Sequence, residues 1–459
     1  MGEMQLDPGF VESVFTEDKN GKRTLDEGAF AEAISELWHC VCYNGLLYDG
    51  TGEIISLSDC KSEVYKMLRR LNVSTNLAKR TNNIVDAIRL QAHVDHIDVP
   101  PNLIAFQNGA LYIDMKTGEI TMASEPVFSL HRLNCKFNPS SKAKTPTRFL
   151  EWVHNLIHEE DIPGFQEYLG YLLLPNTKLQ KAMILIGQGQ EGKSRIGLIL
   201  HYLFGFSCET SSIDFFENNS FAMPRAENKL VLFQDDLKRD KLKSTETFKS
   251  MVSAEIPMQA EKKGENAYSF LPYARWVICS NAPLAALYDT GYAFYRRLYP
   301  IRVKNRPPDR KDDPFYFDPM KGEMDGIFVW LLQGLQRLIV NGWALSQSQE
   351  SKDLVETQRD KEDSVFVFAK SEILYGKNLT ASNDDLYKAY SSFCIRNGLI
   401  ARKKDYLVQF FDEQQDNIKI KQDKHVGENR TLRGYRGMAV KTTVALKALL
   451  DDAGGEDHE

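Results

Sequence analysis

The sequence of 459 residues has little cysteine and no long hydrophobic run. Its seven cysteines are an odd number scattered along the chain and include no C-x-x-C pair, which excludes a disulfide-stabilised scaffold. No apolar stretch approaches the roughly 18 residues that a membrane-spanning helix needs. The first residues, Met1-Gly2-Glu3-Met4-Gln5, lack the basic and apolar pattern of a secretion signal. We therefore expect a cytoplasmic protein that does not enter a membrane.

One stretch offers enough ligand types for a zinc site. His39, Cys40, Cys42 and Cys60 are the candidate ligands. However, Cys40-Val41-Cys42 alternates like a strand, and the spacing differs from that of zinc ribbons. We interpret these cysteines as buried structural thiols.

Length and composition set the broad class. A chain of 459 residues exceeds one compact core, and the usual domain size predicts two to four domains. A hydrophobic content of 42% and a charged content of 26% are those of an ordinary globular protein. The net charge of −6 neither indicates nor excludes nucleic-acid binding, because a local basic surface decides such binding.

A complete phosphate-loop motif, G-x-x-x-x-G-K-S, lies near the middle of the chain. It consists of Gly187, Gln188, Gly189, Gln190, Glu191, Gly192, Lys193 and Ser194. The apolar run 182–186 before it and the periodic stretch 196–203 after it predict the flanking strand and helix of a nucleotide triphosphate site. Loop N–H groups can bind phosphate oxygens, Lys193 can reach the β- and γ-phosphates, and Ser194 can ligate Mg²⁺. We expect ATP and Mg²⁺ as cofactors, and a glycine-rich surface turn is the alternative.

Two further apolar stretches end in polar side chains suited to ATP hydrolysis. Asp235 and Asp236 follow the stretch 229–234, and Asn281 follows 274–280. Because the carboxyl ends of parallel strands lie at one edge of a sheet, one acid can hold Mg²⁺ while its neighbour orients or deprotonates water. Asn281 can hydrogen-bond the γ-phosphate. The alternatives are a simple acidic turn and an Asn favoured by the turn before a proline.

Two basic pairs lie in the same region. Arg296 and Arg297 precede an apolar strand, and an Arg supplied by a neighbouring subunit neutralises charge as the β–γ bond breaks. Lys262 and Lys263 form the tip of a polar turn between two expected strands, where they can hold a nucleic-acid backbone without reading its sequence. The alternative for both pairs is an ordinary solvated surface.

The C-terminal part of the chain is basic. Residues 364–441 contain fourteen Lys or Arg and nine Asp or Glu, a net charge of +5. The pattern predicts a helix over 384–396, a basic cluster of Arg402, Lys403 and Lys404, a second helix, and a strand-turn-strand. This order is typical of a winged-helix module that contacts phosphates through basic groups. A solvated charged face is the alternative.

The ordered motifs from Gly187 to Arg297 resemble the core of superfamily 3 helicases, which are AAA+ ATPases. The closer resemblance is to the phage and plasmid primase-helicase family with a poxvirus-type N-terminal domain. The segments 102–118, 166–171 and 386–398 also resemble parts of that family. The resemblance covers most of the chain.

The resemblance implies an α/β fold built around an AAA+ P-loop ATPase core. The parts that it implies are a mixed α/β poxvirus-type primase-helicase N-terminal domain at 1–140, a helical collar at 141–180, the superfamily 3 AAA+ ATPase core at 181–305, a linker with returning collar helices at 306–363, a basic winged-helix-like domain at 364–445, and an acidic tail at 446–459.

The family implies a hexameric ring that hydrolyses ATP between subunits and pulls a DNA strand through its pore from 3′ to 5′. The roles that it implies are nucleotide and Mg²⁺ binding by Lys193 and Ser194, metal binding by Asp235, water activation by Asp236, γ-phosphate sensing by Asn281, an arginine finger in trans from Arg297 or Arg296, and a pore contact from Lys262 or Lys263.

The chain departs from the family pattern in two ways. Many relatives have one acidic residue where this chain has Gln234-Asp235-Asp236, which leaves the division of labour between the two Asp residues open. No zinc knuckle or metal-carboxylate polymerase motif precedes the ATPase region, so we predict no primase activity. A separate primase or other replication protein is a candidate partner.

We therefore expect an ATP-dependent DNA helicase that acts in the host cytoplasm in the replication of a phage, plasmid or other mobile element. It would act as a homohexamer on single-stranded and forked DNA. The first alternative is a replication initiator or helicase loader that uses ATP only for assembly on DNA. The second is a small-molecule P-loop kinase.

Overall fold

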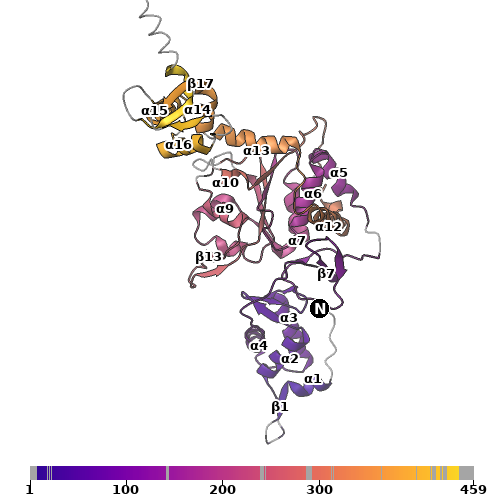
Figure 1. The fold of residues 1–459 in the computed structure, drawn as a ribbon. Coiled ribbons are helices and arrows are strands. Elements are labelled where there is room, and N and C mark those ends of the chain that lie inside the picture. Colours follow the sequence, from indigo (N-terminus) through magenta and orange to yellow (C-terminus); the bar gives the residue numbers. More distant parts are fainter. Residues whose placement is uncertain are drawn as a thin grey trace, which may run out of the picture. The chain divides into compact units, whose positions relative to one another are not determined.

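The structure is a computed structural model with a mixed α/β fold (Figure 1). It describes residues 8–443, except 18, 20, 22, 141–143, 238–241, 243, 286–291, 312, 314, 363, 398, 400, 414, 416–419, 424, 425 and 427–431. The chain divides into two compact units: one runs to residue 351, and the other contains 241–244, 285–296 and the residues from 352 on. The acidic tail expected over 446–459 lies outside the described residues.

A helical lobe begins the first unit. Its elements are α1 (Pro8–Ser13), β1 (Phe15–Glu17), β2 (Arg23–Leu25), α2 (Glu27–Leu37), β3 (Val41–Tyr43), β4 (Leu46–Tyr48), β5 (Ile54–Ile55), α3 (Leu57–Arg70) and α4 (Leu77–Gln91). The Asp26 carboxylate and the Ser56 hydroxyl accept hydrogen bonds from the first N–H groups of α2 and α3, which fixes where these helices begin. Apolar residues at helical spacing, such as Ile84 and Ile88, are fully buried between the helices.

The cysteines of this lobe lie in or beside its core. Cys42 and Cys60 are buried, as expected, and Cys42 belongs to strand β3. Cys40 is only half-buried, because it lies just before the strand. Burial raises the pKa of Cys60 to about 11 and that of Cys40 to about 12, so these thiols stay protonated at neutral pH.

A four-stranded sheet follows the lobe. It consists of β6 (Leu103–Phe106), β7 (Gly109–Ile113), β8 (Ile120–Met122) and β9 (Arg132–Leu133), in the order β8-β7-β6-β9. The turn at Asn108-Gly109 joins β6 to β7, and the one at Thr117-Gly118 joins β7 to β8. The glycine at 118 has a φ of 73°, which a side chain would disfavour.

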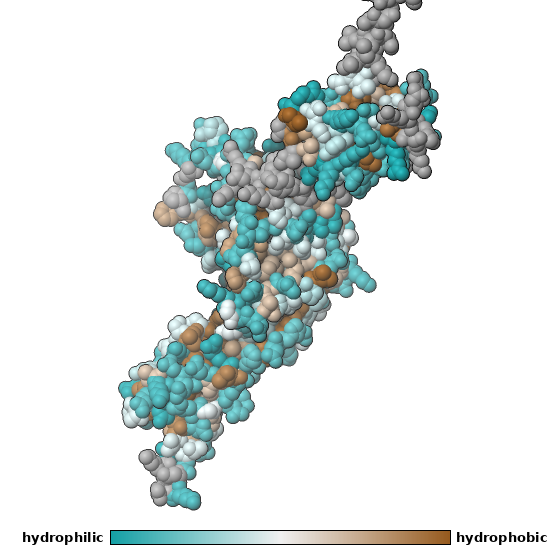
Figure 2. All heavy atoms as spheres, turned by 90° about the vertical axis from the view of Figure 1, so that its left-hand side faces the viewer, coloured by the Kyte–Doolittle hydropathy of each residue, from teal (hydrophilic) through white to brown (hydrophobic). Residues whose placement is uncertain are grey.

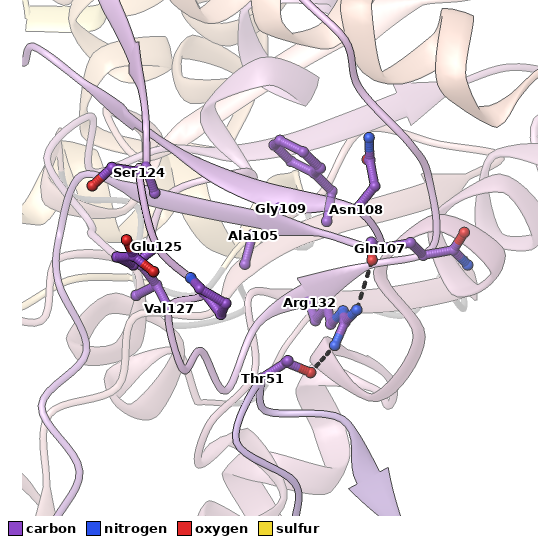
Figure 3. A pocket seen from close by; sticks show the side chains of 12 residues that line it. Thr51, Ala105, Gln107, Asn108, Gly109, Ser124, Glu125, Val127 and Arg132 are labelled. Carbon is purple, nitrogen blue, oxygen red and sulfur yellow. Dashed lines mark hydrogen bonds between the residues drawn. The ribbon is translucent and has the colours of Figure 1, made fainter. Parts of the chain in front are cut away.

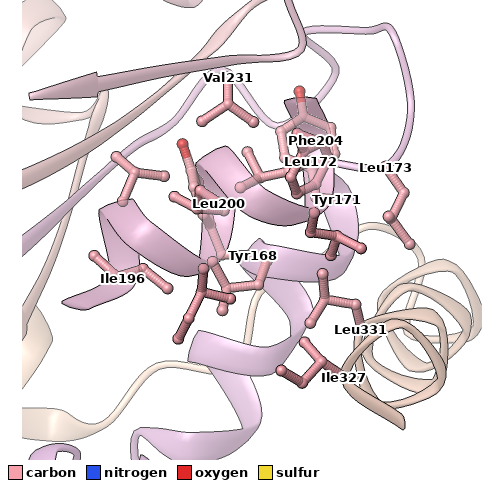
Figure 4. Packing of buried hydrophobic residues seen from close by; sticks show 14 of the residues in the cluster. Tyr168, Tyr171, Leu172, Leu173, Ile196, Leu200, Phe204, Val231, Ile327 and Leu331 are labelled. Atoms are coloured by element: carbon pink, nitrogen blue, oxygen red, sulfur yellow. The ribbon is translucent and has the colours of Figure 1, made fainter. Parts of the chain in front are cut away.

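Three helices pack beside this sheet: α5 (Thr147–Leu156), α6 (Ile162–Tyr171) and α12 (Met324–Val340), with the short α11 (Asp318–Lys321) before α12. A Cβ added at Gly170 of α6 would lie 2.3 Å from the Leu331 carbonyl oxygen of α12, so only glycine permits this approach. Figure 4 shows side chains of α6 and α12 gathered with those of α7 and β12 in one apolar cluster. Phe149 of α5 and Tyr168 of α6 are fully buried in this cluster.

A five-stranded parallel sheet forms the centre of the first unit. It consists of β10 (Ala182–Ile186), β11 (Cys208–Thr210), β12 (Val231–Leu237), β15 (Arg275–Ser280) and β16 (Leu298–Arg302), in the order β11-β12-β15-β10-β16. The connections contain α7 (Arg195–Phe204), η1 (Gly205–Ser207), α8 (Ile213–Asn218), η2 (Met223–Ala226), α9 (Glu246–Val252) and the antiparallel hairpin β13 (Met258–Ala260) and β14 (Tyr268–Phe270). The apolar stretches expected as strands over 182–186, 229–234 and 274–280 and after Arg297 form β10, β12, β15 and β16, whereas β11 was not expected.

The second unit has its own core. Its elements are α10 (Tyr292–Tyr295), α13 (Gln349–Glu362, which begins in the first unit), α14 (Ser364–Glu372), β17 (Ile373–Ser382), α15 (Asn383–Arg396), α16 (Lys404–Glu413), β18 (Lys421–Asp423) and β19 (Gly434–Val440). The helix predicted over 384–396 is α15. Strand β17 precedes it and was not expected, because this strand is mostly exposed and a register shift between Tyr375 and Thr380 interrupts its alternation.

The surface carries little continuous apolar area on the face that Figure 2 shows, where hydrophilic residues predominate. No helix within the described ranges combines the length and the apolar character needed to cross a membrane.

Candidate nucleotide-binding site

The phosphate loop, residues 187–194, connects strand β10 to helix α7, as the sequence predicts. Gly189 and Gly192 have φ values of 115° and 99°, which explains the glycines at these two positions. Strands β12 and β15 run parallel to their neighbours, so their carboxyl ends lie at the same edge of the sheet as the loop. Asp235, Asp236 and Asn281 are therefore brought to the loop.

A pocket of about 550 Å³ lies at this edge. Its lining is made by residues 189–195 of the loop and α7, Asp235 and Asp236 of β12, residues 279–281 of β15, and Arg306 and Arg310. Six of the eight loop-motif positions, both predicted acids and the predicted amide line this one pocket. Lys193 is 7% exposed, so its ammonium group is held inside the protein.

Hydrogen bonds join the predicted site residues to one another. The Ser194 hydroxyl donates to Asp235 Oδ1 at 2.6 Å, and Asn281 Nδ2 donates to Asp236 Oδ1 at 3.3 Å. The Lys193 ammonium donates to Asn281 Oδ1 at 3.3 Å. The two acids thus have different neighbours: Asp235 lies at the loop serine, and Asp236 lies at the amide.

A local irregularity in β12 exposes both carboxylates. The register with β15 shifts between Gln234 and Leu237, and Asp236 has a φ of 54°. Gln234 points the other way and is buried, where its side-chain oxygen accepts a hydrogen bond from the Ile213 N–H at 3.0 Å. Gln234 therefore has a structural contact, and the two Asp residues face the pocket.

The side chain of Glu191 fills the inside of the loop. It is 4% exposed, and its carboxylate accepts hydrogen bonds from the N–H groups of Gln188 and Gly189 and from Lys193 Nζ at 2.7 Å. Burial by itself raises the pKa of Glu191, but the hydrogen bonds from Lys193 and the loop amides outweigh it, and the net effect lowers the pKa. The carboxylate is ionised at neutral pH.

Sequence reasoning missed two arginines of this pocket. Arg310 donates to the carbonyl oxygens of Gln190 and of Glu191, the latter at 2.7 Å, and Arg306 donates to Gln190 Oε1 at 3.3 Å. Both belong to the charged, proline-rich segment after β16, which the sequence indicated only as a linker. The one available signal was the density of arginine in that segment.

The two candidate finger arginines differ in exposure. Arg297 is half-buried, and its guanidinium donates to Ser253 Oγ at 2.8 Å within the same chain. Arg296 is exposed. Of the two side chains, that of Arg296 is the more accessible to a neighbouring molecule.

The lysine pair lies where the sequence placed it, at the turn of the hairpin formed by β13 and β14. Lys262 lies over the Tyr268 ring, with its nitrogen 5.3 Å from the ring centroid, and Lys263 is exposed. The Tyr268 hydroxyl donates to the Glu227 carboxylate at 2.6 Å, which holds the start of strand β14 next to the turn. Neither lysine lines the phosphate-loop pocket.

The basic cluster of the second unit is less available than its sequence indicates. Lys404 forms an ion pair with Asp384, and the Arg402 guanidinium lies over the Tyr406 ring. Lys403 is exposed. A pocket of about 810 Å³ beside α16 is lined by acidic residues of α15 and α16, among them Asp412, and also by Lys404 and Arg433.

Another cavity, of about 330 Å³, lies in the four-stranded sheet region and includes the Asn108-Gly109 turn (Figure 3). Arg132 is its basic side chain. The guanidinium donates to the Thr51 hydroxyl and, at 2.7 Å, to the Gln107 carbonyl oxygen. These bonds tie the sheet to the helical lobe, and the cavity contains none of the predicted site residues.

Comparison with known proteins adds two family matches. Residues 29–157 match the family described as D5 N terminal like. Residues 185–297 match a family of unknown function, DUF5906. The first match agrees with the resemblance to primase-helicases and relates the chain to replication proteins of that kind. The second contains the phosphate loop, both Asp residues and Asn281, but not Arg306 or Arg310. No curated protein sequence matches the chain significantly.

Solved structures add a likeness in fold. The A form apo structure of the NrS-1 C-terminal region has a TM-score of 0.50 and 11% identity, and the match covers 90% of this chain and 100% of that chain. A second apo structure of the same region has a TM-score of 0.50 and 13% identity, with the same coverage. At these identities the likeness concerns the fold alone.

Proposed function

We propose that this protein is an ATP-dependent DNA helicase for the replication of a phage, plasmid or other mobile element. The observation that carries the proposal is the convergence of Lys193, Ser194, Asp235 and Asn281 on one pocket at the carboxyl edge of a parallel sheet. The D5 N terminal like match supports a role in replication. The finer proposal is a superfamily 3 AAA+ core with a winged-helix C-terminal domain.

The pocket residues fit a Mg²⁺–ATP complex. The loop N–H groups and Lys193 are donors for phosphate oxygens, and the paired oxygens of Ser194 and Asp235 are ligands that Mg²⁺ prefers. Bound Mg²⁺ would supply positive charge at the phosphates. Asp236, held by Asn281, is placed to orient and deprotonate the attacking water, and Asn281 to hydrogen-bond the γ-phosphate.

Hydrolysis on this account needs a second copy of the chain. The exposed Arg296 is our candidate for the finger that reaches a neighbour's pocket, because Arg297 is tied to Ser253 in its own chain. A homohexameric ring would then place the Lys262 and Lys263 hairpins around one DNA strand and move along it from 3′ to 5′. Lys403, with Arg402 and Lys404, is a secondary candidate for DNA contact, and a separate primase is a candidate partner in the host cytoplasm.

Strand displacement tests the proposal. A forked duplex with one labelled strand is incubated with protein, Mg²⁺ and ATP, using loading tails of either polarity. We expect displacement from the 3′-tailed substrate by the wild-type protein and none by Lys193→Ala. Hydrolysis without displacement would instead identify an initiator or loader. Hydrolysis that is insensitive to single-stranded DNA would favour a small-molecule kinase.

A further inference from the structure

Glu191 places a negative charge where a phosphate-binding loop directs its donors. Its carboxylate is nearly fully buried and accepts from two loop N–H groups and from Lys193. The fit is tight: a Cβ added at Gly187 would lie 2.8 Å from the carboxyl carbon of Glu191. The anion is therefore seated against the loop backbone.

The donors that hold this carboxylate are of the kind that hold nucleotide phosphates. Inward N–H groups and the loop lysine provide the affinity of a phosphate loop for its ligand. Two anions cannot share Lys193 and the same N–H groups, because like charges in a poorly hydrated site repel strongly. Phosphate and carboxylate thus exclude each other.

We propose that Glu191 is an internal competitor of the nucleotide, whose carboxylate occupies the phosphate site and must turn out of it before a nucleotide binds. The inference rests on the proposed function, because it assigns regulation to the same pocket. It concerns this chain's own loop, at a motif position where any residue type is allowed.

The arginines outside the loop explain how it keeps its shape during this exchange. Arg310 holds the backbone carbonyls of Gln190 and Glu191, and Arg306 holds the Gln190 side chain. Glu191 can therefore leave by side-chain rotation while its backbone stays fixed. The Glu191 carboxylate itself is held by the loop amides and Lys193.

The competition discriminates among anions by the number of contacts they make. A single phosphate forms few contacts beyond those that the carboxylate loses when it leaves the site. A triphosphate with Mg²⁺ gains further contacts at Ser194 and Asp235, which the carboxylate does not touch. The site would therefore reject inorganic phosphate and accept nucleoside triphosphates. Only molecules in which Glu191 has turned out of the site can bind, so the apparent affinity is the intrinsic affinity multiplied by the fraction of such molecules.

The test compares equilibrium binding of ATP, with Mg²⁺ and without DNA, to the wild-type protein, Glu191→Gln and Glu191→Ala. Glu191→Gln keeps the shape but removes the charge that pairs with Lys193. We expect it to bind ATP about tenfold more tightly, because loss of the charged hydrogen bond to Lys193 weakens the seated state of the side chain. A tenfold change corresponds to about 1.4 kcal/mol. Glu191→Ala should bind at least as tightly as Glu191→Gln.

Glu36→Gln is the matched control, because Glu36 is exposed on α2 and its replacement changes the net charge equally. It should bind like the wild type. Far-ultraviolet circular dichroism of each variant verifies folding. Unchanged or weaker binding by both folded Glu191 variants, with a wild type that binds ATP, would overturn the inference and leave the proposed function intact. Absence of ATP binding in the wild type and in all Glu191 variants would overturn both.

Discussion

The Ser194 hydroxyl donates a hydrogen bond to Asp235 Oδ1, and the two oxygen atoms lie 2.6 Å apart. Ser194 is the N-cap residue of α7 and Asp235 lies near the end of β12, 41 positions further along the chain. Asp236, the next residue, instead accepts from Asn281. The two adjacent carboxylates thus have different partners, and on this difference we base the separate roles that we propose for them.

The first prediction concerns this separation. Asp235→Asn should weaken Mg²⁺-dependent ATP binding, because it removes a negative ligand beside Ser194. Asp236→Asn should leave ATP binding near the wild-type value and reduce the hydrolysis rate by about 100-fold to 10,000-fold, the usual contribution of a general base. Titrating binding with Mg²⁺ and measuring turnover separates the two effects. Equal losses of binding in both variants would contradict the assignment.

A second prediction distinguishes the two arginines. Arg296→Ala should abolish hydrolysis but restore part of it when mixed with Lys193→Ala subunits, because a mixed interface then contains one complete site. An arginine finger contributes about 1,000-fold to 100,000-fold to the hydrolysis rate of GTPases that use one, so the recovery should be readily measurable. Arg297→Ala removes the bond to Ser253 and should mainly lower thermal stability. Recovery with Arg297→Ala alone would reverse the assignment.

The lysine hairpin provides a third prediction. Replacing Lys262 and Lys263 with Ala should reduce the stimulation of ATP hydrolysis by single-stranded DNA and leave the basal rate unchanged. Loss of two phosphate contacts should reduce the slope of log affinity against log salt by about 1.4 for single-stranded DNA. Lys116→Ala with Lys136→Ala, both exposed in the four-stranded sheet region, is the matched control. An unchanged salt slope would argue for a simply solvated hairpin.

A fourth prediction concerns stability and pH. His131 is buried, with its ring nitrogens 2.8 Å from the Ser207 and Tyr273 hydroxyls. Burial, followed by the nearby charges of Arg275 and Lys229, lowers the pKa of His131 to about 3. Between pH 6.5 and about 3 the unfolded chain binds a proton that the folded chain does not, so stability falls as the pH falls.

Urea unfolding at pH 7.5 and 5.5 measures this effect. On acidification the wild type should lose about 1.4 kcal/mol more than His131→Gln, because one pKa unit corresponds to about that free energy. The comparison uses the difference between two pH values, so a constant loss of stability in the variant does not affect it. Equal losses in both proteins would show that His131 is protonated in the folded state.

The sequence predicts those features that depend on local pattern. Buried apolar runs bounded by polar residues identify β10, β12, β15 and β16 of the parallel sheet, and the glycine-rich motif identifies the loop between β10 and α7. Parallel strand direction then brings Asp235 and Asn281 to the loop, as the structure shows. These inferences succeed because the signal and its cause lie within a few residues of each other.

Features that depend on distant contacts could not be predicted in this way. Arg306 and Arg310 lie more than one hundred positions beyond the loop residues that they contact, in a segment without regular structure. Glu191 occupies a variable motif position, and only its side-chain conformation reveals its contact with Lys193. Buried and exposed residues do not alternate regularly along β17, so its local pattern does not indicate a strand. Its pairing with β19 decides its conformation.

ATP hydrolysis by wild-type protein and Lys193→Ala, with and without single-stranded DNA, tests the central claim most directly. Lys79→Ala, exposed on α4, is the control for loss of a lysine. We predict hydrolysis by the wild type and the control that rises when DNA is added, and none by Lys193→Ala despite normal folding. Equal hydrolysis by wild type and Lys193→Ala, or a wild-type rate indifferent to DNA, would contradict the claim that this pocket couples ATP to a polynucleotide.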